Sequence, residues 1–301
     1  MGEIIQPHVE YDRILPYLNF DGVDNIVLVA GVGRSGSTTM GRVMGRYVNN
    51  KPTHNFHRWW YQPGKSILRM QQAGKQNPEA IKIAQGVNAD GTVVLKESIC
   101  FTDEESLFNP LELYLEYFIP SQIRVIFTVQ HPSKMLESWL RNFSTDKLGK
   151  EKLTENFHSA YRTFIGALNL TQQFNITHTL YHPSLVMPNS SQNQTQASML
   201  ALEKMMEKIG LFSQDPERLS QAVNWNAYNM YETYVQQSGV LVPPEPDLNA
   251  KTINCRAMET LMRTTGLTHI PYVFQEGASP EVGSTIMDHY NQLLVQHDLS
   301  D

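Results

Sequence analysis

Residues 25–48, NIVLVAGVGRSGSTTMGRVMGRYV, decide the fold that this sequence predicts. The first part, 25–32, is a short apolar run rich in β-branched side chains, which is typical of a strand buried on both faces. A glycine-rich turn follows, and residues 37–48 then carry apolar side chains at helical spacing. We therefore expect a buried parallel strand, a tight loop and a helix, in that order.

The loop at residues 31–39, GVGRSGSTT, has the composition of an anion-binding site. Its glycines allow turns with positive φ, so that successive N–H groups converge on an anion beside the positive end of the helix. Gly31 and Gly36 have the spacing of a Walker A loop, but Ser37 replaces the lysine of that motif. The cation is instead Arg34, whose guanidinium can bind two oxygens of a phosphate or sulfate.

Two other interpretations of the loop stay open. One is a tight turn that only joins a strand to a helix. The other is a dinucleotide site of the G-x-G-x-x-G type at residues 31–36, which would need an acidic residue about 20 positions further on. That region of the chain contains Lys51, His54 and His57 instead.

The rest of the chain alternates short apolar runs with amphipathic stretches. We expect further buried strands at 92–95, 123–129 and 177–181, and helices at 66–85 (in two pieces divided at Pro78), 103–118, 132–143, 152–172, 196–209 and 280–297. Strands that alternate with helices predict an α/β fold, a central parallel sheet flanked by helices. We expect one domain over residues 1–301, with an N-terminal extension at 1–22, a lid or substrate loop at 49–64 and a C-terminal helical part at 240–301.

Composition narrows the class of protein. The chain has 301 residues, 41% of them apolar, and its net charge of −6 argues against a nucleic-acid binder. The two cysteines, Cys100 and Cys255, suit a reducing compartment, the N-terminus lacks the pattern of a signal peptide, and no apolar run approaches the ~18 residues of a membrane span. We expect a cytoplasmic protein with neither nucleic-acid nor membrane partners. The oligomeric state is left open, a homodimer included.

With these motifs in view, the chain resembles the superfamily of sulfotransferases that use 3′-phosphoadenosine 5′-phosphosulfate (PAPS). Residues 33–38, GRSGST, are similar to that family's 5′-phosphosulfate loop in its Arg-Ser-Gly form. A second match covers residues 127–139, where Pro132 and Ser138 fit the family pattern. Gln130 departs from it, because the family has at this position the arginine that binds the 3′-phosphate.

Two weaker matches extend the resemblance over roughly residues 25–230. Tyr181 lies in a stretch similar to the family's strand-ending segment, whose tyrosine is beside the nucleotide, and Trp225 would supply a ring to the adenine. The family's C-terminal Arg-Lys-Gly motif has no clear match, and Arg256 and Arg263 are candidates by residue type alone. The resemblance implies a P-loop sulfotransferase fold, PAPS as the bound nucleotide and no metal. The implied nucleotide contacts are Gly33, Arg34, Ser35, Gly36, Ser37, Thr38, Thr39, Gln130, Ser138, Tyr181 and Trp225.

Sulfuryl transfer needs charge stabilisation and a general base. Lys96, at the end of the expected second strand, would lie at the carboxyl edge of the sheet near the sulfuryl group. Ser98 occupies the position where cytosolic relatives have a histidine, so His57, His54 and Glu97 are the candidate bases. A histidine titrates near neutral pH, whereas Glu97 would need burial to raise its pKa. The less specific alternatives are solvated histidines and an ion pair between Lys96 and Glu97.

Three functions are consistent with these residues. The first is sulfuryl transfer from PAPS to a hydroxyl or amine of a small-molecule acceptor, by in-line displacement. The second is a P-loop nucleotide or small-molecule kinase, against which the missing Walker lysine counts. The third is a non-catalytic nucleotide-binding protein of the same fold, which Gln130 and Ser98 favour.

Overall fold

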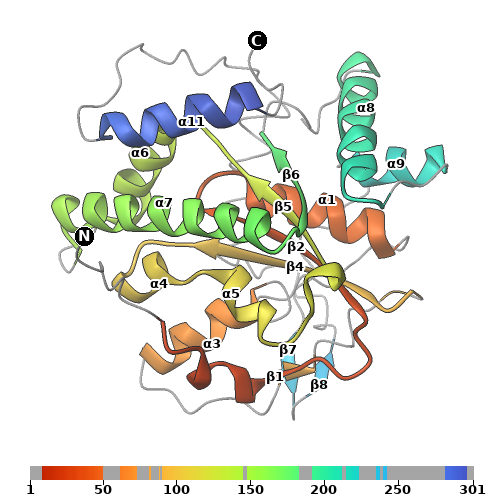
Figure 1. Ribbon diagram of the computed structural model, residues 1–301, viewed down its shortest axis with the longest axis horizontal. Helices are drawn as coiled ribbons and strands as arrows, with labels where there is room; N and C mark the ends of the chain where they lie inside the picture. The colour runs from red at the N-terminus through yellow and green to blue at the C-terminus, as the bar shows by residue number, and fades with distance from the viewer. Residues whose placement is uncertain are drawn as a thin grey trace.

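The computed structural model has a four-stranded parallel sheet at its centre (Figure 1). It describes residues 9–49, 62–72, 81–82, 88, 90–144, 148–182, 192–211, 215–223, 235–237, 240–242 and 282–296. The strands are β2 (Asn25–Val32), β4 (Thr92–Ile99), β5 (Ile123–Thr128) and β6 (Thr177–Tyr181), in the spatial order β4-β2-β5-β6. The expected α/β fold with a central parallel sheet flanked by helices is confirmed.

The register brings the carboxyl ends of the strands to one edge of the sheet. Gly31 of β2 lies opposite Ser98 of β4 on one side and opposite Thr128 of β5 on the other. Thr128 in turn lies opposite Tyr181 of β6. In open parallel sheets ligands bind outside this edge, and the helices that follow β2 and β5 here pack on opposite faces, which marks the switch point of the topology.

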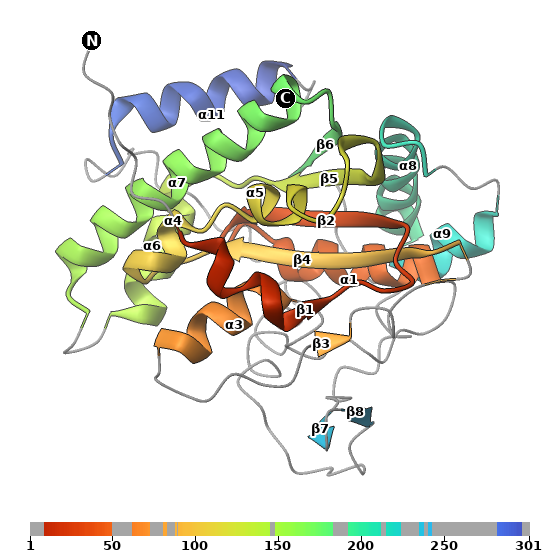
Figure 2. The same cartoon turned by 60° about the horizontal axis from the view of Figure 1, so that its bottom comes forward.

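The two faces of the sheet are covered by different helices. Side chains of α1 (Ser37–Asn49), α8 (Gln192–Lys208) and α9 (Pro216–Val223) form one apolar cluster. The other cluster uses α3 (Pro63–Gln72), α5 (Pro110–Leu115), α6 (Pro132–Phe143), α7 (Lys150–Gln173) and α11 (Ser284–Gln296), with α4 (Asp103–Leu107) against α7 (Figure 2). Alternate residues of β2 belong to alternate clusters, so both faces of this strand are buried, as its apolar run predicts.

Several boundaries differ from the sequence expectation. β4 runs four residues beyond the expected 92–95. The apolar pattern did not predict this, because Lys96, Glu97 and Ser98 are polar although they are buried. The expected helix 103–118 is two helices, because Asn109 caps α5 and Pro110 occupies its first position.

Other segments also depart from their expected form. The expected helix 66–85 is wrong at residues 81–82, which form β3 (Ile81–Lys82) and pair in parallel with β1 (Leu18–Asn19). β1 and two 3-10 helices, Tyr11–Arg13 and Leu15–Tyr17, lie where no element was expected. Of the expected lid at 49–64, Asn49 ends α1 and Pro63 begins α3, while residues 50–61 lie outside the described part of the chain.

The C-terminal third is only partly described. α11 falls within the expected helix 280–297, but residues 240–242 of the expected helical part form a strand, β8 (Val240–Val242), antiparallel to β7 (Val235–Gln237). Helix α9 was not expected from the sequence. Among the described residues, no helix has both the length and the apolar character that a membrane crossing requires.

We predict that Asn109→Ala lowers the free energy of unfolding by about 1 kcal/mol, because the buried Asn109 Oδ1 accepts the Leu111 N–H at 3.1 Å at the start of α5. Urea unfolding measures the change. Asn109→Ser keeps a capping oxygen and should recover most of the loss. Equal losses in the two variants would contradict the capping role.

Candidate functional site

The glycine-rich loop, residues 31–39, joins β2 to α1 at the carboxyl edge of the sheet. Within it Arg34 has φ 76° and Gly36 has φ 91°, both in the left-handed region. This conformation costs an arginine roughly 1 kcal/mol or more, so the surrounding structure must hold it. Left-handed residues in a glycine-rich loop are typical of anion-binding nests, and within this loop the Ser35 N–H already donates to the Val32 carbonyl at 3.1 Å.

Hydrogen bonds to both neighbouring strands fix the loop. The hydroxyls of Ser35 and Thr128 lie 2.6 Å apart, and those of Ser37 and Ser98 lie 3.0 Å apart. The Gly33 N–H donates to the Ile99 carbonyl of β4 at 2.7 Å. The expected ligand contacts Ser35 and Ser37 therefore use their buried hydroxyls within the protein, so the loop's own hydroxyls hold its shape.

Helix α6 supplies the other side of the loop. Arg34 Nε donates to Ser138 Oγ at 2.9 Å, so the structure brings together two side chains that the sequence assigned to one nucleotide. Trp139 Nε1 donates to the Gly33 carbonyl at 2.8 Å, and Asn142 Nδ2 donates to Ser138 Oγ at 3.2 Å. The start of α6 is itself capped, since His131 Nδ1 accepts the Ser133 N–H.

The remaining expected nucleotide contacts are dispersed. Gln130 is half-buried and follows β5 at the same edge as the loop. Tyr181 ends β6, and its ring is buried in the cluster beneath α1, which raises its pKa. Thr38 is half-buried in the first turn of α1, and the side chain of Thr39 lies outside the description. His54, His57, Trp225, Arg256 and Arg263 also fall outside the described residues.

Lys96 does not lie at the edge of the sheet, as the sequence suggested, because β4 continues to Ile99. It is opposite Val29, inside the strand, and only 4% exposed. Lys96 and Glu97 are successive strand residues, so their side chains leave opposite faces of the sheet. Lys96 is on the face of α1, where Ser98 meets Ser37, and Glu97 is on the face of α3 and α5.

Glu97 anchors the beginning of α3. Its Oε1 accepts the Gly64 N–H at 2.7 Å and the Tyr114 hydroxyl at 2.9 Å, and its Oε2 accepts the Lys65 N–H at 3.3 Å. Burial raises the pKa of Glu97 to about 7, which is the tuning that a glutamate base requires. Its oxygens are nevertheless occupied by these three donors, which gives the carboxylate a structural role at the helix N-terminus.

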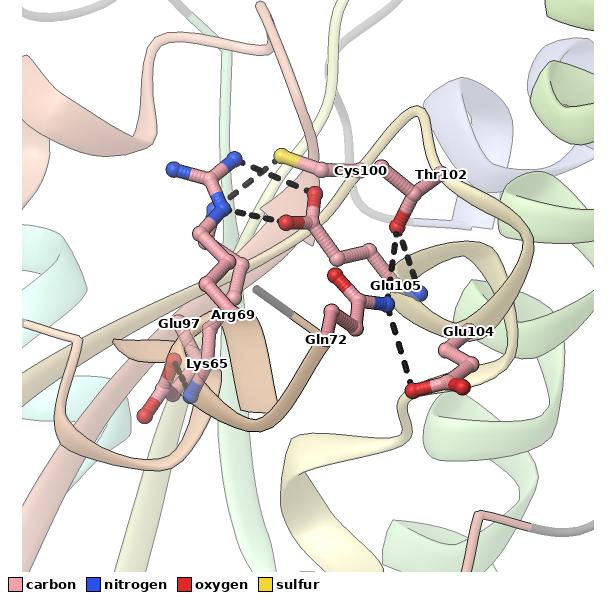
Figure 3. Close-up of polar contacts among 8 residues, drawn as sticks. All are labelled: Lys65, Arg69, Gln72, Glu97, Cys100, Thr102, Glu104 and Glu105. Carbon is pink, nitrogen blue, oxygen red and sulfur yellow. Dashed lines mark hydrogen bonds and ion pairs between the residues drawn. The ribbon is translucent and has the colours of Figure 1, made fainter. Parts of the chain in front are cut away.

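Two buried lysines and a half-buried arginine surround the end of β4, and the sequence did not predict this group. Lys65, 3% exposed, points its Nζ at Cys100 Sγ at 3.1 Å (Figure 3). Burial and the charge of Lys65 hold the pKa of Lys96 well below its usual value. Arg69 forms a two-pronged ion pair with the buried Glu105, with Nη2 to Oε2 at 3.1 Å. Pro63 at the start of α3 was the one sequence signal that a helix, and not a lid, carries Lys65.

This arrangement suits an anion at the carboxyl edge. The charge of Glu97 acts on Lys96 and Arg69, Lys65 acts on Glu97, and Arg69 is in addition paired with Glu105. Charges buried to this degree are costly to fold and concentrate at functional sites. Among the residues with described positions, no group of three His, Cys, Asp or Glu side chains is placed to hold a metal ion.

Comparison with known proteins assigns no family to this chain. No protein-family model matches it, and no curated protein matches it either. Any function of the site is therefore inferred from its own residues.

The raised pKa of Glu97 predicts a pH dependence of stability. The native carboxylate titrates near pH 7, whereas in the unfolded chain it titrates near 4.5, so the native state holds the proton more tightly. The contribution of Glu97 to stability is therefore largest below about pH 4.5 and falls as the pH rises through 7. The Gln side chain of Glu97→Gln stays neutral at every pH. As the pH rises from 4.5 to 8, the free energy of unfolding of this variant should therefore increase relative to that of the wild type by roughly 3 kcal/mol at most.

Urea unfolding of both proteins at several pH values between 4.5 and 8 tests this. Glu116→Gln is the matched control, because Glu116 is exposed, and its profile should run parallel to that of the wild type. A constant difference between Glu97→Gln and the wild type across this range would show that Glu97 is ionised in both states.

Proposed function

We propose that this chain is a PAPS-dependent sulfotransferase, which transfers a sulfuryl group to a hydroxyl or amine of a small-molecule acceptor. The observation that carries the proposal is the loop at residues 31–39. Its left-handed Arg34 and Gly36 give the backbone the turns that anion-binding nests use, and the same Arg34 contacts Ser138 of α6. A loop with arginine here and no Walker lysine is the feature that resembles the 5′-phosphosulfate loop of this superfamily.

The loop and the first turn of α1 would hold the phosphosulfate. The first N–H groups of a helix have no acceptor within the helix, and they lie at its positive end. Among the described residues, the Arg34 side chain is bonded only to Ser138 through Nε, which leaves its two terminal nitrogens for oxygens of the ligand. The donor brings an activated sulfuryl group, and the protein contributes position and positive charge.

The reaction would be an in-line displacement. The acceptor oxygen or nitrogen forms a bond to sulfur while the bond from sulfur to the 5′-phosphate breaks, which releases adenosine 3′,5′-bisphosphate. Arg34 would stabilise charge on the transferred group. Lys96 and Lys65 are both buried behind the loop, so they would not touch the donor. Their electrostatic field would attract an anion to a chain whose net charge is −6.

The proton of the acceptor needs a base, and three side chains are proposed for it. His57 and His54 precede α3 in the sequence, on the segment outside the described residues. Glu97 has a pKa of about 7, but its oxygens accept three hydrogen bonds from α3 and α5. We therefore prefer a histidine as the base. Ser98, whose hydroxyl is engaged with Ser37, is not proposed for this role.

A non-catalytic nucleotide-binding protein is the second candidate. Gln130 gives the edge of β5 no charge for a 3′-phosphate, and the one described candidate base is engaged in the fold. Such a protein would bind adenosine 3′,5′-bisphosphate without turnover of any acceptor.

Thermal-shift titration with adenosine 3′,5′-bisphosphate, and with ATP in the presence and absence of Mg²⁺, tests the proposal. A ligand that binds only the native state raises the melting temperature. We expect the bisphosphate to raise it without metal and more than ATP does. A preference for Mg·ATP would support a kinase in place of the sulfotransferase, and no shift with either ligand would remove both.

We predict that Arg34→Ala weakens binding of adenosine 3′,5′-bisphosphate at least tenfold, because it removes the guanidinium beside the nest. The free energy of unfolding should change by less than about 1 kcal/mol, since Arg34 is exposed and, among the described residues, makes one side-chain hydrogen bond. Arg162→Ala, which removes an exposed arginine on α7, is the control and should bind as the wild type does. Wild-type affinity in Arg34→Ala would take the loop out of the site.

We also predict that Gln130→Arg tightens binding of the same nucleotide, because a guanidinium at this edge would give the 3′-phosphate a positive partner that Gln130 does not provide. Adenosine 5′-phosphate is the control ligand, and its affinity should change much less. Calorimetric titration measures both affinities. Weaker binding of the bisphosphate by Gln130→Arg would place the 3′-phosphate elsewhere.

A further inference from the structure

Cys100 and Lys65 form a buried contact that the proposed transfer reaction does not use. Cys100 follows directly after β4 and is 7% exposed, and Lys65 lies in the first turn of α3. Lys65 Nζ donates to Cys100 Sγ over 3.1 Å (Figure 3). The two residues belong to separate elements, so the fold, and not their place in the sequence, brings the amine to the thiol.

Several charged side chains surround the sulfur. Besides Lys65, the cations Arg34, Arg69 and Lys96 all lie within electrostatic range of Cys100. The carboxylates that face the same region are Glu97, bonded to α3 and Tyr114, and Glu105, paired with Arg69. Of these charged groups, the Lys65 amine is the one in hydrogen-bond contact with the sulfur, so it is the nucleophile that an oxidised Cys100 would meet first.

The space around the sulfur limits which oxidants can reach it and which group an oxidised sulfur would meet. A Cβ placed on Gly33 would lie 3.1 Å from Cys100 Sγ, so the glycine-rich loop closes over the thiol on that side. Bulky oxidants such as a disulfide have no approach from the loop, whereas hydrogen peroxide is small. An oxidised sulfur would find the Lys65 amine already in contact, at a very high effective concentration.

We propose that Cys100 and Lys65 are a modification site, at which hydrogen peroxide joins Sγ and Nζ by a reversible sulfenamide bond. In the first step the thiolate attacks one peroxide oxygen and the O–O bond breaks. The Lys65 ammonium gives a proton to the departing hydroxide, which leaves water, a sulfenic acid and a neutral amine.

In the second step the amine nitrogen attacks the sulfur. An S–N bond forms, the S–O bond breaks, and hydroxide leaves with a proton from nitrogen as a second water. Overall one thiol, one amine and one peroxide give the sulfenamide and two waters, with sulfur oxidised by two electrons and the peroxide reduced by two. A thiol such as dithiothreitol reverses the bond by attack on sulfur.

The bond would tie the start of α3 to the end of β4, directly behind the glycine-rich loop. Gly64 and Lys65 are already held to Glu97 on the same strand, so the backbone needs little movement to accept it. The site does not depend on which nucleotide the loop binds, and it can be tested without one.

Peptide mass spectrometry of the full-length protein after treatment with hydrogen peroxide tests the proposal. Cys255→Ser provides the background, because it removes the second cysteine of the chain. We expect a linked pair of peptides containing Lys65 and Cys100, lighter by two hydrogen atoms than the free pair, which dithiothreitol separates. The same protein oxidised in concentrated urea should not form the link, although its thiol still oxidises.

Two variants complete the test. Lys65→Arg keeps a cation beside the thiol, so Cys100 should still be trapped as a sulfenic acid by dimedone, with no linked peptide. Cys100→Ser should give neither product. A link that forms equally in urea, a link to another lysine, or Cys100 oxidised in the folded protein without any link would overturn the proposal. A linked pair that retains one oxygen atom would overturn the direct S–N bond.

Discussion

At their carboxyl ends β2 and β5 approach so closely that only a glycine fits between them. A Cβ on Gly31 would lie 2.3 Å from Thr128 Oγ1 and 2.6 Å from the Thr128 carbonyl oxygen, a backbone atom that cannot give way easily. Ser35 returns to the same threonine, hydroxyl to hydroxyl. This contact fixes where the loop leaves the sheet, and α1 begins two residues later. The direction of the α1 N-terminus, and therefore the position of any bound anion, follows from it.

Strand β4, the other neighbour of β2, carries buried polar residues with different roles on its two faces. β4 carries Lys96 and Ser98 on the face of α1, where Ser98 holds the loop through Ser37. It carries Glu97 on the opposite face, where the carboxylate holds the start of α3. The alternation of a strand makes this division unavoidable, since neighbouring residues cannot share a face. An ion pair between Lys96 and Glu97 across one face is thereby excluded, although the charge of Glu97 acts on Lys96 through the sheet.

Buried charge is the most unusual property of this edge. Burial raises the pKa of Glu97 and holds that of Lys96 well below its usual range, so both groups are destabilised in their charged forms. Two lysines, an arginine and a thiol gather behind a loop whose arginine is itself in a strained conformation. Proteins keep such arrangements where chemistry or binding needs them, and here they lie at the switch point of the sheet. An anionic ligand at the loop would offset part of the cost of the clustered cations.

The sequence by itself determined the alternation of strands and helices and the loop between the first two. Asn25–Val32 and Thr177–Tyr181 are found at their expected bounds. For Asn25–Val32 the reason is local, because a uniform apolar run that ends in glycine defines a buried strand. Pro132–Phe143 is likewise found as expected, since proline at the first turn of a helix is a local signal. The glycines and Arg34 also identified the loop, because a tight turn depends on residues that are adjacent in the sequence.

Only the tertiary structure decided where β4 ends and which side chains meet behind the loop. Lys96 and Glu97 look like a strand terminus in the sequence, yet both are buried within β4, and hydrogen bonds from α3 and α5 satisfy the Glu97 carboxylate. Lys65 and Cys100, 35 positions apart, meet through the packing of α3 on β4. Local pattern reports how each segment buries its own apolar side chains. It does not report which distant partner satisfies a buried charge, because that depends on how separate elements pack.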